Sequence, residues 1–445
     1  MRTPLKSAVA ALACAAALAA TAGAQTQPRD AAESDPRTLG WMQGTPPPPD
    51  RQITAQNGDY FAFPQMRWTV CNIRALFPTV EVARGRGPAT PLPRPPAPEA
   101  ARIAAEIDAL TFTPLGGGAP ITWRAARAAS YADGLLILHG GRIVYEWYSG
   151  CLTETGTHAA MSMTKSTIGL MAEILVAEGR LEASSTAADI VPELAGTAFG
   201  DATVRQVMDM TTGIAFDEDY DNPDADICAY AAAGSPFPRP AGAEGPLGYL
   251  AYVPTVARDG AHGAAFGYRT VNTDVLAWIV ARVAGQPIQT LLSDRIWGPM
   301  GAERAGYFTV DAVGTPFAGG GLSAGLRDLG RLGLLLLDCG MIDGRRLFPA
   351  AAVDSIRAGG DRTAFAKAGY NTIPGGSYRS MFWVFHDDHG AFAARGVHGQ
   401  TIYVDPAAEM VIVRVASHPS AKNARIDPVS LPAYRVVADH LMGAE

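Results

Sequence analysis

Lysine is scarce in this chain: it occurs at positions 6, 165, 367 and 422, against a total of 36 lysines and arginines. Arginine supplies the same surface charge but keeps its proton in proteins, whereas a buried lysine can lose its proton and act as a base. The lysine at position 165 therefore calls for a chemical explanation.

The chain also has no run of basic residues, and its formal net charge is −7. Both observations argue against nucleic acid or an anionic membrane surface as the main partner. With 445 residues and 48% hydrophobic content, the chain can bury a large core. These totals favour a globular protein that binds small molecules.

No segment after the N-terminus is long and apolar enough to cross a bilayer. Residues 1–24 combine a basic start, an alanine-rich apolar stretch and the small-residue end Ala22-Gly23-Ala24. This pattern predicts a cleaved signal peptide, with an uncleaved membrane anchor as the alternative, and hence a secreted, periplasmic protein.

The sequence contains no Cys-x-x-Cys spacing, so a structural zinc site is not expected. Export would place the mature chain in an oxidising compartment, where disulfides form. The sequence leaves their pairing open among Cys71, Cys151, Cys228 and Cys339.

Residues 25–100 differ in composition from the rest. We expect residues 25–40 to be polar and flexible, and the proline-rich stretches 44–51 and 86–102 to be extended. The aromatic segment between these stretches predicts an arm, residues 25–100, that packs on a main domain of residues 101–445.

Strand patterns lie at both ends of the main domain. A hairpin is expected around His139-Gly140-Gly141, and four further strands between residues 379 and 417. Between them, apolar residues recur at helical spacing in 203–210, 272–285 and 326–340. We predict an α+β fold: an antiparallel sheet built from both ends of the domain and flanked by helices, an all-helical lobe over about 185–315, and a cleft between the two.

Ser162 and Lys165 stand three residues apart where an apolar helix is expected to begin. Residues i and i+3 share one face of a helix, so the hydroxyl and the amine can meet as nucleophile and base. The helix N-terminus adds N–H donors that would stabilise a negative oxygen. The alternative is a serine cap beside a lysine that extends to solvent.

Ser162-Met163-Thr164-Lys165 resembles the Ser-x-x-Lys element of the β-lactamase and penicillin-binding-protein superfamily. Four further stretches resemble the branch that holds class C β-lactamases, related esterases and 6-aminohexanoate-dimer hydrolases. They are "TVRQVMDMTTGIAF", "FGYRTVNTDVLAWIVARVAG", "GGGLSAGLRDLGRLGLLLLDCG" and "RGVHGQTIYVDP". The 6-aminohexanoate-dimer type is the closest likeness, partly through "FDEDYDNPDAD".

This resemblance implies roles for several residues. Ser162 would be acylated, and Lys165 and Tyr268 would share the proton transfers, with Tyr268 protonating the leaving group. A nearby ammonium would lower the pKa of the phenol. Thr270 stands where the family has Asn or Ser, and Tyr220 matches a substrate-facing tyrosine, although a tyrosine in a polar surface loop is the alternative.

The resemblance also implies an oxyanion hole made by the N–H groups of Ser162 and Val397. Gly396 stands for the glycine of the family's Lys-Thr-Gly element, whose lysine is absent. Arg395 or His398 would have to replace that lysine in binding a substrate carboxylate. An esterase or amidase is therefore favoured over a working β-lactamase.

Two other motifs in the sequence suggest different chemistry. Gly321-Leu322-Ser323-Ala324-Gly325 fits a nucleophile elbow, but no buried strand is expected before it, and Ser323 is interpreted as a cap for the helix that follows. The run "HDDH" at 386–389 lies between two predicted strands, which favours a hairpin turn over a metal site.

The sequence thus predicts a serine hydrolase that cleaves an ester or amide of a small molecule through an acyl-enzyme, without metal or organic cofactor. The alternatives are a β-lactamase or D-amino-acid peptidase on the same fold, and a non-catalytic binding protein of the cell envelope. Substrate identity and oligomeric state stay open.

Overall fold

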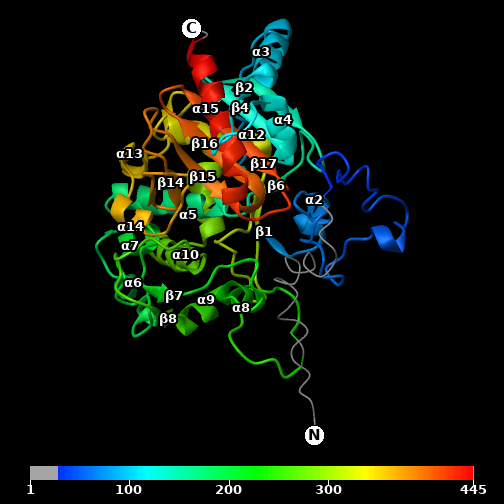
Figure 1. Cartoon of the computed structure of the whole chain (residues 1–445). Helices are drawn as coiled ribbons and strands as arrows, with labels where there is room; N and C mark the ends of the chain where they lie inside the picture. The colour runs from blue at the N-terminus through cyan, green and yellow to red at the C-terminus, as the bar shows by residue number, and fades with distance from the viewer. Residues whose placement is uncertain (1–28, 240, 444–445) are drawn as a thin grey trace.

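A computed structural model describes residues 29–239 and 241–443, so the predicted signal peptide lies outside the described residues (Figure 1). The chain forms an α+β fold, as predicted. Its central element is an antiparallel seven-stranded sheet in the order β13-β14-β15-β16-β17-β4-β5. The strands are β4 (Ala132–His139), β5 (Arg142–Tyr148), β13 (Ser377–Arg379), β14 (Phe382–Val384), β15 (Phe392–Gly396), β16 (Gln400–Asp405) and β17 (Met410–Ala416).

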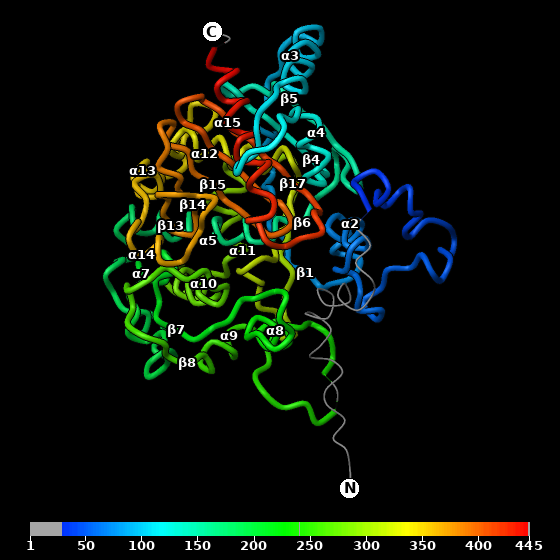
Figure 2. Tube along the Cα trace, in the orientation of Figure 1, coloured from blue at the N-terminus to red at the C-terminus, as the bar shows by residue number. Residues whose placement is uncertain are grey.

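Both ends of the main domain build this sheet, because β4 pairs with β17 along its length. Figure 2 shows β4 and β17, which are far apart in sequence, side by side in the trace. The predicted hairpin is confirmed: β4 and β5 are joined by Gly140 and Gly141, both with positive φ (52° and 74°). Glycine adopts such angles without steric cost, which explains the tight turn.

Helices cover both faces of the sheet, which explains the unbroken apolar run of residues 135–138 in β4. Successive side chains of a strand point to opposite faces. Leu136 and Leu138 belong to the core shared with α5 (Met163–Ala177) and α12 (Leu326–Leu337). Leu135 and Ile137 pack on the other face, against three helices: α3 (Ala97–Ala109), α4 (Trp123–Ala129) and α15 (Asp427–Gly443).

A second sheet was not predicted. Its order is β1-β9-β10-β6, and its strands are β1 (Thr79–Val82), β6 (His158–Ala159), β9 (Gly306–Thr309) and β10 (Leu322–Ala324). The expectation that no strand lies between the hairpin and residue 379 was wrong. These strands have two to four residues, too few to show an alternating pattern.

The segment over 185–315 holds more helix than strand but is not all-helical as expected, because it also contains β9 and the two-residue strands β7 (Ile214–Ala215) and β8 (Ala257–Arg258). Its α-helices are α6 (Ala187–Ile190), α7 (Val204–Met208), α8 (Asp226–Ala233), α9 (Tyr249–Tyr252), α10 (Val271–Ala284) and α11 (Ile288–Leu292). Within the described residues no single helix has the length and apolarity to span a membrane; α10 with the following helical segment to Trp297 passes that test only as a pair bent by 72°.

The N-terminal segment is more ordered than the sequence suggested. Residues 31–42 form turns rather than a flexible stretch, and Ser34 and Asp35 are buried. The second proline-rich stretch is not extended throughout, because α3 begins at Ala97 with a proline in its first turn, where the missing N–H costs nothing.

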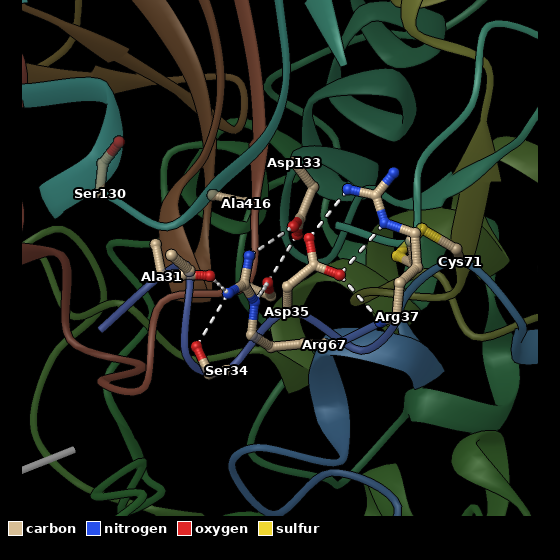
Figure 3. A network of polar contacts seen from close by, with 12 residues as sticks. Ala31, Ser34, Asp35, Arg37, Arg67, Cys71, Ser130, Asp133 and Ala416 are labelled. Atoms are coloured by element: carbon tan, nitrogen blue, oxygen red, sulfur yellow. Dashed lines mark hydrogen bonds and ion pairs between the residues drawn. A yellow bond between two sulfur atoms is a disulfide. The ribbon is translucent and has the colours of Figure 1, made fainter. Parts of the chain in front are cut away.

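Arg67 joins this segment to the central sheet (Figure 3). Its guanidinium is 1% exposed, donates to Asp133 Oδ1 of β4 at 3.0 Å and to Ser417 Oγ at 3.0 Å, and also reaches Ala31 and Ser34. A disulfide between Cys71 and Cys151 forms a second link between the two parts. The division into an arm of residues 25–100 and a main domain stays a prediction. Substitution of Arg67 would test whether the arm is held to the main domain.

Candidate active site

Ser162 lies at the junction of the two sheets and the helical segment. It is the residue before α5, and its hydroxyl makes no capping hydrogen bond to the helix. The turn before it is held from two sides: the Ala159 N–H donates to Val70 O at 2.7 Å, and the Ala160 N–H donates to Leu322 O at 2.8 Å. Met161 has a φ of 47°, a left-handed conformation that is costly for a residue with a side chain and is frequent at functional sites.

Lys165 meets Ser162 as the three-residue spacing predicts. The amine lies 3.0 Å from Ser162 Oγ and also donates to the Gly319 carbonyl at 2.5 Å. The side chain is 1% exposed, so it does not extend to solvent, and the capping interpretation does not hold. Burial lowers the pKa of Lys165 to about 8, although the charges of Glu218 and Asp274 oppose this shift.

Tyr268 completes the predicted group. The Lys165 amine lies 5.2 Å from the centre of its ring, and the ring stacks on Trp383 with centroids 5.7 Å apart. Burial and the charge of Glu218 raise the pKa of Tyr268 well above 10, while a hydrogen bond with Ser162 acts in the other direction. The expectation that a nearby ammonium lowers this pKa was wrong, because burial dominates.

Glu218 belongs to the same site, and the sequence analysis missed it. Its Oε1 accepts hydrogen bonds from the hydroxyls of Tyr220 and Thr270, both at 2.6 Å, and its Oε2 accepts from the Thr270 N–H. The carboxylate has no ion-pair partner among the described residues. Burial is the largest cause of the raised pKa of Tyr220 and Tyr268, and the charge of Glu218 is the second. The only signal was an acidic loop, 217–226, which usually indicates a solvated surface.

Tyr220 and Thr270 are therefore both placed at the site by one carboxylate. Tyr220 is half-buried rather than free in a surface loop. Thr270 is 2% exposed and gives its hydroxyl hydrogen to Glu218, so it does not offer the amide of the family's usual asparagine. The loop is also bound from outside, because Lys422 bridges Asp219 at 3.0 Å and Asp221 at 2.7 Å.

The end of β15 meets the start of α5 at Gly396. A side-chain Cβ at this position would lie 2.9 Å from the Ser162 nitrogen and 2.9 Å from the Ala160 carbonyl oxygen, so only glycine fits. Val397 follows directly. His398 has a φ of 62° and its Nδ1 donates to the His418 carbonyl at 2.7 Å, which leaves Nε2 as an acceptor. Burial lowers the pKa of His398, so the ring is neutral at pH 7.

Arg395 does not offer a free charge to a substrate. Its guanidinium pairs with Asp427 and lies 5.2 Å from the centre of the Trp383 ring. With His398 neutral and Arg395 paired, neither residue named as a replacement for the missing lysine presents an unpaired cation.

The rival motifs occupy structural positions. Ser323 lies inside β10, opposite Ala159 and Tyr307, and Gly325 is the residue that caps α12, so the capping role expected for Ser323 was wrong. The run 386–389 connects β14 to β15, as expected for a turn, and its His389 pairs with the buried Asp405 at 2.8 Å.

The described residues bring few candidate metal ligands together. Among the described residues the one compact group of candidate ligands is Cys71, Cys151 and His158, and its two cysteines are joined in the disulfide. A disulfide sulfur carries no thiolate for a metal. Cys339 is free.

Comparison with known proteins identifies the family. A sequence model described as β-lactamase matches residues 124–431. The chain belongs to the β-lactamase family. It is 34% identical over 358 residues to the 6-aminohexanoate-dimer hydrolase of Paenarthrobacter ureafaciens, covering 80% of this chain and 86% of that one. The likeness stated from the sequence is confirmed.

Solved structures extend this result. A Bacillus anthracis protein assigned as a 6-aminohexanoate-dimer hydrolase superposes with a TM-score of 0.76 at 26% identity, over 90% of this chain and 99% of that one. A penicillin-binding-protein homologue of Caulobacter crescentus shares the fold, with a TM-score of 0.52 at 19% identity over 71% of this chain and 96% of that one. The protein is thus a serine-type hydrolase of this family, related to 6-aminohexanoate-dimer hydrolases.

Proposed function

We propose that this protein hydrolyses a linear amide of a small molecule through an acyl-enzyme on Ser162. The observation that carries the proposal is the 3.0 Å hydrogen bond between the Lys165 amine and Ser162 Oγ in a buried setting. A buried amine with a pKa of about 8 is partly neutral near pH 7 to 8, so it can take the serine proton during attack.

In this mechanism Ser162 Oγ attacks the carbonyl carbon while Lys165 takes its proton. The N–H groups of Ser162 and Val397 would stabilise the oxyanion, and the close approach of Gly396 to Ser162 supports this placement. Tyr268 then protonates the leaving nitrogen. A phenol whose pKa is raised stays protonated, which suits a proton donor and assigns the base role to Lys165. Lys165 passes the serine proton to the Tyr268 phenolate, so both groups return to their starting states. Water then attacks the ester carbon and gives a proton to neutral Lys165; as the ester bond breaks, this proton goes to Ser162 Oγ and the acyl group leaves as a carboxylic acid.

The charges around the site favour a substrate with a free amine. Glu218 is a carboxylate without a cationic partner among the described residues, and Arg395 is already paired. A cationic group would be attracted to this site. The name of the Paenarthrobacter relative specifies such a substrate class, the dimer of 6-aminohexanoate.

A labelling experiment tests the nucleophile. A fluorophosphonate should label the purified protein and the control variant S323A equally, and should not label S162A. Labelling of S162A at the wild-type rate would refute the assignment.

A substrate panel tests the reaction. The panel contains linear 6-aminohexanoate dimer, its N-acetylated form, a nitrophenyl ester, a D-amino-acid peptide and a cephalosporin. We expect the unmodified dimer to have the highest kcat/KM among the amides. A cephalosporin that exceeds it would favour a β-lactamase instead.

We also propose that the chain is exported and loses residues 1–24. Expression of the full chain in a Gram-negative host, followed by fractionation and N-terminal sequencing, should place a protein that begins at Gln25 in the periplasmic fraction. A cytoplasmic protein with an intact N-terminus would contradict this.

A further inference from the structure

A buried carboxylate lies behind the site and has no role in the mechanism above. Asp274, in the first turn of α10, is 1% exposed. Its Oδ2 accepts a hydrogen bond from the Tyr230 hydroxyl, and its Oδ1 has no hydrogen-bond partner in the part of the chain that the structure describes. Asp274 also forms no ion pair within 4.0 Å among those residues.

Burying such a carboxylate lowers the stability of the folded protein. A buried carboxylate with an unsatisfied oxygen loses hydration that the contacts with the Tyr230 hydroxyl and the Ala318 N–H do not restore. The surroundings are aromatic: Tyr230 packs against Tyr249 and Phe317, and Phe317 stacks on Tyr249 with centroids 4.9 Å apart. An asparagine would fill the same space without the charge, so the charge itself needs an explanation.

Two connections lead from Asp274 to Lys165. The first is mechanical: the Ala318 N–H interacts with the Asp274 carboxylate, and the next residue, Gly319, supplies the carbonyl that accepts from the Lys165 amine. A Cβ at Gly319 would lie 2.4 Å from Thr270 Cγ2, so this turn is fitted closely against the residue that precedes α10.

The second connection is electrostatic. Burial raises the pKa of Asp274 to about 7 against the smaller, opposite effect of Lys165, so the carboxylate is largely charged in the range near pH 8 where Lys165 titrates; Asp274 in turn raises the pKa of Lys165 against the larger effect of burial. The other groups that face Lys165 are the Ser162 hydroxyl, the Tyr268 ring and Glu218. Those that act on Asp274 are Tyr230, Ala318, Lys165 and Asp311.

We propose that Asp274 is a positioning residue for the reaction, which fixes the Ala318–Gly319 turn that orients the Lys165 amine and provides the buried counter-charge of that amine. The proposal rests on the acyl-enzyme mechanism proposed above. It explains why a carboxylate is kept in an apolar helix and why the amine of Lys165 is held toward Ser162.

The test uses D274N, which keeps the shape and a hydrogen-bond acceptor but removes the charge. Loss of a nearby anion disfavours the ammonium, so the acid limb of the kcat/KM profile should move to lower pH by on the order of one unit. D274A also removes the support of the turn, and we expect its kcat to fall by at least about tenfold with little change in KM. The matched control is D405N, which alters a buried aspartate beside His389, away from the site, and should leave the limb in place.

A second variant keeps the test decisive if D274N fails to fold. Y230F removes a hydrogen bond that stabilises the Asp274 anion, so it should shift the limb in the same direction by a smaller amount. Unchanged limbs in the folded variants would overturn the proposal. Fluorophosphonate labelling of the wild-type protein distinguishes failure of this proposal from failure of the acyl-enzyme mechanism. If Ser162 of the wild-type protein is not labelled, the mechanism itself is refuted.

Discussion

Replacing Arg67 with methionine should strongly destabilise the protein. The arginine and its partner Asp133 are 1% and 0% exposed, and they join the N-terminal segment to β4. Without the guanidinium, the hydrogen bonds that Asp133 keeps among the described residues are those with the Ser417 hydroxyl at 2.6 Å and the His158 ring at 3.3 Å. Breaking a buried ion pair from one side costs about 3–5 kcal/mol, a large part of a typical stability of about 5–15 kcal/mol.

Unfolding in guanidinium chloride, followed by circular dichroism, measures this loss of stability as a lower denaturant concentration at the midpoint. The double variant R67M/D133N should recover part of the loss, because it removes the unpaired charge as well. The control is R435M, whose exposed pair with Asp388 should contribute at most about 1 kcal/mol. A loss below about 1 kcal/mol for R67M would show that the buried pair does not hold the segment to the sheet.

Three further results are expected. With neutral Lys165 as the base, kcat/KM should rise with pH through about 8, and no alkaline limb from Tyr268 should occur below pH 10; a limb centred near pH 6 would contradict the assignment. E218Q should reduce the preference for a free-amine dimer over its acetylated form by on the order of tenfold, measured as a ratio of kcat/KM, and an unchanged ratio would exclude Glu218 as the attracting charge. K422M should raise KM severalfold while changing the free energy of unfolding by less than about 1 kcal/mol, because it removes the ion pairs that hold the loop carrying Glu218. The control is K367M, which changes a lysine bound to the Ala264 carbonyl. Equal KM values in the two variants would show that the ion pairs of Lys422 are not needed to hold this loop.

The contact between Ser162 and Lys165 could be predicted because it depends on local geometry alone. Residues i and i+3 meet on a helix whatever the rest of the chain does, and the helix itself was visible from its apolar spacing. Tyr268 required the family resemblance, since no local rule relates a tyrosine to a serine 106 positions away. The long strands of the central sheet were visible for the same reason as the helix: each has a pattern of its own.

Glu218 and Asp274 could not be predicted in this way. An aspartate near the start of an apolar helix is common at helix N-termini, and an acidic loop is usually solvated, so neither residue type carried a specific signal. Their roles arise from burial and from partners far away in the sequence, such as Thr270 for Glu218 and Tyr230 for Asp274. The short strands β6 and β10 were missed for a related reason, because pairing with distant strands, not local propensity, forms them.

The disulfide between Cys71 and Cys151 has a consequence for how the protein can be produced and shortened. Cys71 adjoins Val70, whose carbonyl accepts a hydrogen bond from the Ala159 N–H of β6, the strand that leads into Ser162 and α5. The segment that leads into Ser162 is thus held beside a covalent cross-link that forms only where thiols can be oxidised. Expression in a reducing cytosol would leave this disulfide unformed. A gene trimmed to residues 124–431, the stretch that matches the family, would lack Cys71 and therefore the same cross-link.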